Sequence, residues 1–180
     1  MTKKTLIITT ILTVLLSLFV PSTSYAQPYG KGIYNADVPY GNQTSLSIST
    51  DGNVEIPITP TSSGASASGT SQVTVSSTDV MGYKLYIRAL DNTYMDNLGD
   101  QLPASANGSP APLAINTWGY NTDASSNFVG ITLSDVLIRS NSSPVTSEIT
   151  TVTYGISLDM AKPAGNYTAS VVYTAVPQTD

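Results

Sequence analysis

Residues 150–176 carry two runs of alternating apolar and polar side chains, which constrain the fold more than any other stretch. In the first run the apolar residues stand at even positions: Val152, Tyr154, Ile156, Leu158 and Met160. In the second run they stand at odd positions: Tyr167, Ala169, Val171, Tyr173 and Ala175. Successive side chains of a β-strand point to opposite faces, so each run predicts a strand with one apolar face. Pro163 and Gly165 lie between the runs, and we predict a hairpin with its loop at 161–165.

Residues 1–26 have the three parts of a secretory signal peptide. Two lysines near the N-terminus precede an apolar run from Leu6 to Val20, and the small residues Ser24 and Ala26 follow. The run is short for a membrane span, which needs about 20 residues. We therefore expect cleavage after Ala26 rather than a retained anchor, no membrane span in the cleaved chain, and a secreted, extracellular or cell-surface location.

The composition excludes several kinds of chemistry. The chain has no cysteine and no histidine, which removes disulfides, thiol nucleophiles, imidazole bases and most zinc or copper sites. Seven Lys and Arg residues stand against twelve carboxylates, for a net charge of −5. An acidic chain with few cations is a poor partner for nucleic acid or anionic lipid.

The first part of the exported chain predicts two strands. We interpret residues 27–44, rich in Tyr, Gly, Asn and Pro, as an irregular leader that could instead add a strand around Ile33 to Val38. Apolar residues then alternate over 46–48 and again over 54–58. Asp51-Gly52 lies between these runs and predicts a two-residue hairpin turn.

The middle of the chain predicts short strands joined by loops and turns. Low-complexity residues 59–70 predict a flexible loop, and 90–112 predict a long loop. Further strands are expected at 72–76, 81–89, 113–120 and within 128–138. Without a helical pattern beyond the signal peptide, about eight to ten strands predict one all-β domain over 45–180, an antiparallel, Ig-like β-sandwich.

The predicted 90–112 loop holds the only candidate metal ligands. Asp91, Asp96 and Asp100 supply the hard oxygen atoms that Ca²⁺ prefers, and Asn92 and Asn97 lie among them. Their spacing differs from the EF-hand pattern. The alternative is a solvated turn held by Asx hydrogen bonds. No other cofactor is expected.

Four aromatic residues are candidates for a binding surface. Trp118, Tyr120, Tyr86 and Tyr94 could stack on sugar rings or contact a partner protein, because their rings combine apolar area with a polar group. The alternative for Trp118, the only tryptophan, is a position in the core of the sandwich.

Catalysis by paired carboxylates is a further hypothesis. Twelve carboxylates allow some pairing, and a sandwich can host glycoside hydrolysis. Glu55 lies between Val54 and Ile56, but strand alternation places it on the opposite, solvent-facing side.

The chain resembles the WxL-type domains of bacterial cell surfaces. The resemblance rests on Ala164-Gly165-Asn166-Tyr167 and the final strand 171–175, with smaller matches at Gly82-Tyr83-Lys84-Leu85 and around Trp118. It covers about 72–176. The last Trp-x-Leu of that family is Tyr-Thr-Ala here, at 173–175, and Trp118 is followed by Gly-Tyr, so peptidoglycan attachment cannot be assigned to named residues. The resemblance implies a secreted, non-enzymatic surface domain.

These observations lead to one main functional hypothesis and two alternatives. We expect a secreted, non-enzymatic β-sandwich of the bacterial cell surface or envelope, which binds a cell-wall glycan or another surface protein. The first alternative is a fibre or matrix subunit that self-associates when the leader adds a strand to the next copy. The second is a carbohydrate-active or calcium-binding secreted domain.

Overall fold

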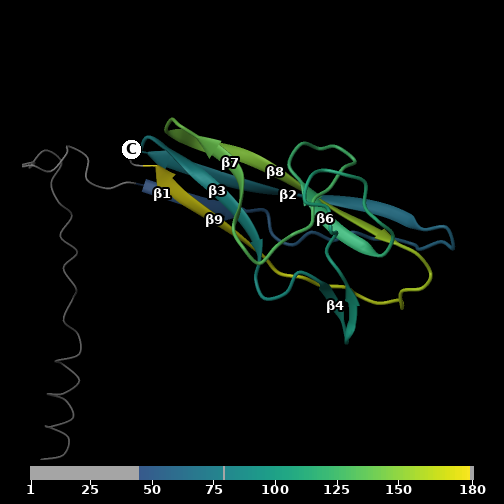
Figure 1. The fold of residues 1–180 in the computed structure, drawn as a ribbon. Coiled ribbons are helices and arrows are strands. Elements are labelled where there is room, and N and C mark those ends of the chain that lie inside the picture. Colours follow the sequence, from purple (N-terminus) through teal and green to yellow (C-terminus); the bar gives the residue numbers. More distant parts are fainter. Residues whose placement is uncertain (1–44, 79, 179–180) are drawn as a thin grey trace, which may run out of the picture. The chain divides into compact units, whose positions relative to one another are not determined.

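The computed structural model describes residues 45–78 and 80–178 (Figure 1). The predicted signal peptide and the leader 27–44 lie outside these residues. The described part is all-β and has nine strands and no helix. The strands are β1 (Ser45–Thr50), β2 (Ala65–Thr78), β3 (Gly82–Ala89), β4 (Met95–Asn97), β5 (Asp100–Leu102), β6 (Thr117–Asn121), β7 (Val136–Asn141), β8 (Val145–Leu158) and β9 (Val171–Gln178).

Two antiparallel sheets form the body of the fold and share one core. One has the order β1-β2-β8-β6 and the other β7-β3-β9, while β4 and β5 form a separate hairpin. Val73 and Val75 of β2 and Leu85 and Ile87 of β3 are fully buried in the same cluster. Their alternation with polar neighbours gives each sheet one apolar face, and packing these faces together removes them from water. The predicted β-sandwich class is confirmed.

The predicted hairpin at 150–176 is wrong. Its two halves form strands, but β8 lies in the four-stranded sheet and β9 in the three-stranded sheet. β8 pairs with β2 along one edge and, over Thr153–Ser157, with β6 along the other, whereas β9 pairs with β3. Residues 159–170 instead cross from one sheet to the other, and the apolar faces of the two strands meet across the core.

The predicted turn at Asp51-Gly52 is also wrong. The Asp51 carboxylate accepts hydrogen bonds from Ser71 Oγ at 2.8 Å and from the Gln72 backbone N–H at 2.9 Å. These bonds hold the chain along β2, and residues 51–60 continue outside any strand. Burial still alternates there as expected, with Ile56 partly buried and Glu55 exposed.

The predicted flexible loop at 59–70 is wrong for its second half. Residues 65–70 form the beginning of β2 and pair with β8. Alanine and serine alternate here, so the segment has the period of a strand but little apolar contrast. Pairing with the long strand β8 supplies the backbone hydrogen bonds that stabilise it.

Other expected strands are confirmed. β3 buries Tyr83, Leu85 and Ile87 on one face, and β6 carries Trp118. The predicted long loop contains the β4–β5 hairpin, whose residue Leu102 is fully buried. The described residues include no helix with the length and apolar character that a membrane span requires.

Candidate functional site

A groove lies between the segment that follows edge strand β1 and the segment that leads into edge strand β9. One wall comes from residues 50–56, which follow β1, and the other from 169–173, which lead into β9. The groove has a volume of about 350 Å³. It is lined by Thr50, Gly52, Asn53, Val54, Ile56, Ser71, Met95, Trp118, Tyr154, Ala169, Ser170, Val171 and Tyr173.

Two tyrosines meet at the groove. Tyr154 comes from β8 and Tyr173 from β9, and their hydroxyl oxygens lie 2.5 Å apart. Burial raises the pKa of Tyr154, and Tyr173 beside it raises that pKa further. Burial also raises the pKa of Tyr173, although the hydrogen bond with Tyr154 acts in the opposite direction. Both hydroxyls therefore stay neutral in ordinary buffers and can donate or accept hydrogen bonds.

Asp51 stabilises the groove wall that residues 50–56 form. The hydrogen bonds from Ser71 and from the Gln72 backbone lower the pKa of Asp51 below its usual value. The carboxylate is thus held in its charged form by the strand behind the groove. Asp51 itself is not among the lining residues, so it positions the wall and leaves Asn53 and Val54 to face the groove.

The lining is uncharged. None of the described residues that line the groove is Lys, Arg, Asp or Glu. Hydroxyl groups, one side-chain amide and backbone groups supply hydrogen bonds, while Val54, Ile56 and Val171 supply apolar surface. Such a mixture suits an uncharged ligand with both polar and apolar faces.

The structure separates the four aromatic residues that the sequence suggested as a binding surface. Trp118 is 1% exposed and Tyr120 is 3% exposed. The Trp118 indole Nε1–H donates to the Thr93 backbone oxygen at 3.0 Å, so the core position is the correct alternative for this residue. Tyr86 lies on the outer side of β3, and Tyr94 is partly buried before β4. Burial removes Trp118 and Tyr120 from any exposed aromatic surface, although Trp118 contributes to the lining of the groove.

Sequence reasoning missed the tyrosine pair. The alternation predicts Tyr154 and Tyr173 on the apolar faces of two strands, without a contact between them. The available signal was their chemistry, because a tyrosine on an inward face needs a partner for its hydroxyl group. Two such tyrosines in successive strands pointed to a polar contact inside the sandwich.

The predicted calcium ligands are not brought together. No group of three or more carboxylates within 45–78 and 80–178 is arranged to hold a metal ion. Asp96 pairs with Gln101, while Asp100 pairs with Asn97, one position further along the hairpin. Strand alternation therefore sends the Asp96 and Asp100 side chains to opposite faces. Asp91 lies before the hairpin and is exposed.

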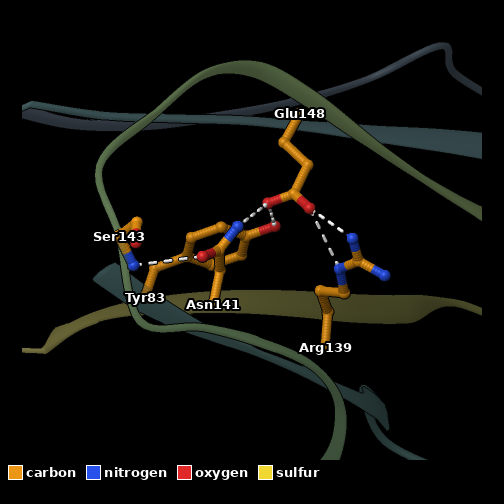
Figure 2. A network of polar contacts seen from close by, with 5 residues as sticks. All are labelled: Tyr83, Arg139, Asn141, Ser143 and Glu148. Carbon is orange, nitrogen blue, oxygen red and sulfur yellow. Dashed lines mark hydrogen bonds and ion pairs between the residues drawn. The ribbon is translucent and has the colours of Figure 1, made fainter. Parts of the chain in front are cut away.

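A second polar cluster links the two sheets around Glu148 (Figure 2). Its carboxylate accepts hydrogen bonds from the Tyr83 hydroxyl at 2.7 Å and from Asn141 Nδ2 at 3.0 Å, and it pairs with Arg139. Burial and then the Glu148 carboxylate raise the pKa of Tyr83 to about 12. Tyr83 of β3 and Arg139 and Asn141 of β7 all donate to the Glu148 carboxylate, so the cluster ties β8 to the β3–β7 pair.

No protein-family model, no curated protein and no solved structure matches this chain. The WxL-type resemblance therefore stays a prediction.

Proposed function

We propose that this protein is a secreted, non-enzymatic binding protein of the cell surface or envelope, and that the groove holds an uncharged glycan of the cell wall. One observation carries the proposal: the groove between 50–56 and 169–173 combines the Tyr154–Tyr173 pair with apolar walls and lacks charged lining residues. A sugar ring has hydroxyl groups at its rim and apolar C–H faces, which match these two kinds of surface.

The size of the groove fits this role. Its volume of about 350 Å³ lies at the lower end of the range for small-molecule sites, about 300–1,000 Å³. A site of this size accommodates one or two sugar units rather than a long chain. Its two walls are separate segments, so a longer glycan can continue outside the groove.

The chemistry of the lining favours binding over hydrolysis. Glycoside hydrolysis uses two carboxyl groups on either side of the scissile bond, about 5–10 Å apart. The described lining residues supply no carboxylate, and the nearby Asp51 is occupied by Ser71 and Gln72. A glycan in the groove would be held without an acid and a base to cleave it.

Filling the groove tests the proposal. Ala169 is exposed and lines the groove, so Ala169→Trp should block it without disturbing the core. We expect the wild-type protein to co-sediment with purified bacterial cell walls and to bind uncharged glycan fragments in calorimetric titrations, and Ala169→Trp to lose both activities. Ala106→Trp, at an exposed alanine outside the groove, is the matched control. Wall binding that survives Ala169→Trp unchanged, or no binding to any glycan tested, would contradict the proposal.

Assembly by strand addition is the second candidate, and the sheet topology favours it. β7 and β9 are the edges of the three-stranded sheet and have no outer strand partner among the described residues. Unpaired edges accept an added strand. If the leader of another copy supplies that strand, electron microscopy of the concentrated protein should show fibres, and Ala36→Pro with Val38→Pro should abolish them. Monomers at every concentration would rule out this route.

A further inference from the structure

The outer faces of the two sheets differ in chemistry. On the four-stranded sheet, Gln72 pairs with Thr151 and Thr74 with Ile149, so the face is mostly hydroxyl and amide. On the three-stranded sheet, Tyr86 stands between Leu137 of β7 and Thr174 of β9.

The neighbouring positions on the three-stranded sheet add apolar and cationic groups. Lys84 pairs with Val176, and Arg88 pairs with Val172. We call this surface the Tyr86 face; it comprises Lys84, Tyr86, Arg88, Leu137, Val172 and Val176. Leu137 is 48% exposed and Val176 is 43% exposed, so apolar area remains open to solvent beside two cations. An exposed apolar patch of this kind marks an interaction surface more often than an isolated side chain does.

A second exposed apolar feature is the tip of the β4–β5 hairpin. Leu98 is fully exposed, at 102%. The exposed carboxylates Asp96 and Asp100 lie two residues to either side. We call these three residues the Leu98 tip. The Leu98 tip is negatively charged, whereas the Tyr86 face carries two cations.

The hairpin that carries the Leu98 tip is firmly held. The backbone of Asp96 exchanges two hydrogen bonds with Thr168, at 2.9 and 3.0 Å. Lys162 Nζ donates to the Gln101 backbone oxygen at 2.6 Å, and Leu102 anchors the other strand in the core. The tip is therefore presented on a rigid support.

The residue type at the tip is not explained by folding. Leu98 has a φ of 53° and Gly99 a φ of 103°, as in a two-residue turn that favours Asn-Gly or Gly-Gly. A leucine is strained in this left-handed region, and here its side chain gains no burial in return. Burial of the Leu98 side chain by a partner would supply the apolar contact that the strained position lacks within the chain.

We propose that the Leu98 tip of one copy docks on the Tyr86 face of a second copy. Leu98 packs on the apolar area formed by Tyr86, Leu137 and Val176. Asp96 and Asp100, which lie on opposite faces of the hairpin, then approach one cation each, Lys84 or Arg88. Lys84 has no ion-pair partner within 45–78 and 80–178, and the one ion pair of Arg88 there is a 3.6 Å contact with Asp135, besides its hydrogen bonds to the backbone oxygens of Ala89 and Leu90. Because the two surfaces differ, a docked pair keeps one free Leu98 tip and one free Tyr86 face, and the association extends head to tail.

Sedimentation velocity of the purified full chain over a range of concentrations tests the proposal. We expect the average mass to rise with concentration at low salt and less so at high salt, because salt screens the charge pairs. Leu98→Asn should weaken association by on the order of tenfold or more, since it removes a buried leucine from the contact. Ile149 is similar in size to leucine and is 53% exposed on the other sheet. Ile149→Thr is therefore the matched control and should associate like the wild type.

Charge reversal makes the test specific for these two surfaces. Lys84→Glu alone and Asp96→Lys with Asp100→Lys should each stay monomeric. A mixture of these two variants should form a heterodimer, because the first variant keeps an unaltered Leu98 tip and the second keeps an unaltered Tyr86 face. A wild-type protein that is monomeric at all concentrations, association that survives Leu98→Asn, or failure of the mixture to associate would overturn the proposal.

Discussion

The hydroxyl oxygens of Tyr154 and Tyr173 lie 2.5 Å apart, and this contact joins the two large sheets. Alternation along the sequence assigns both residues to apolar strand faces, and the structure brings these faces together across the core rather than side by side in one sheet. The pair lines the groove, so it contributes both to the sandwich and to the proposed site.

Removing the Tyr173 hydroxyl should destabilise the fold. In Tyr173→Phe the Tyr154 hydroxyl, on a buried residue, loses its partner, and we expect a loss of about 1–2 kcal/mol in the free energy of unfolding. Urea unfolding followed by the fluorescence of Trp118, the only tryptophan, measures this loss. The double variant Tyr154→Phe with Tyr173→Phe should lose less than the sum of the single variants. Additive losses would show that the hydroxyls do not interact.

The Glu148 cluster should make stability sensitive to acid (Figure 2). Burial acts to raise the pKa of Glu148, but hydrogen bonds from Tyr83, Arg139 and Asn141 outweigh it and hold the pKa below its usual 4.5. The contribution of Glu148 is therefore fully present above pH 4.5 and is lost as the pH falls through the lowered pKa.

Glu148→Gln tests this pH dependence. At neutral pH the variant should be less stable than the wild type by about 1–2 kcal/mol. The difference should shrink when urea unfolding is repeated at decreasing pH below 4.5. Glu55→Gln, at an exposed carboxylate, is the control and should leave the stability difference near zero at each pH. A Glu148→Gln difference that is constant with pH would argue against the charged cluster.

Gly155 should tolerate no side chain. A Cβ atom there would lie 2.5 Å from two carbons of the Phe128 ring, which covers the outer side of β8. Since Phe128 is buried and cannot move freely, Gly155→Ala should lower the free energy of unfolding by about 1–3 kcal/mol. Gly108→Ala places its methyl group in open space and serves as the comparison. Equal stability of the two variants in thermal unfolding would mean that the ring adapts at little cost.

Leu98→Asn should stabilise the monomer. Asparagine adopts the left-handed conformation more readily than leucine, and the exposed Leu98 side chain has no burial to lose. We expect a gain of about 1 kcal/mol in the free energy of unfolding, measured in urea at low protein concentration. Leu98→Gly should show the same direction. A loss of stability in both variants would mean that Leu98 makes a contact within the monomer.

The strands most accurately predicted were those with strong apolar contrast. Over 81–89, Tyr83, Leu85 and Ile87 alternate with polar or charged residues, and both the strand and its buried face follow directly. Residues 65–70 alternate only between small side chains, so their sequence resembles a loop although they lie in β2. Asp51-Gly52 matches a turn dipeptide, and Gly52 has a φ of 103°, but hydrogen bonds from Ser71 and Gln72 hold Asp51 beside β2 instead of closing a hairpin.

The candidate site was less predictable than the fold. Trp118, Tyr120, Tyr86 and Tyr94 were identifiable as aromatic residues, but their exposure depends on which elements cover them. Asp91, Asp96 and Asp100 are close in sequence, yet the register of the β4–β5 hairpin separates two of them to opposite faces. The groove is formed by segments more than a hundred residues apart, so no local pattern describes it.

The sequence by itself determined the all-β class, the inward face of most strands, and the lack of histidine and cysteine chemistry. These features depend on each residue and its near neighbours, because strand alternation is a local property. Only the tertiary structure decided which strands pair, and it placed the halves of 150–176 in different sheets. Backbone hydrogen bonds are alike for any antiparallel partner, so the choice depends on how all the apolar faces pack together. That choice also brought Tyr154 and Tyr173 together and opened the groove beside them.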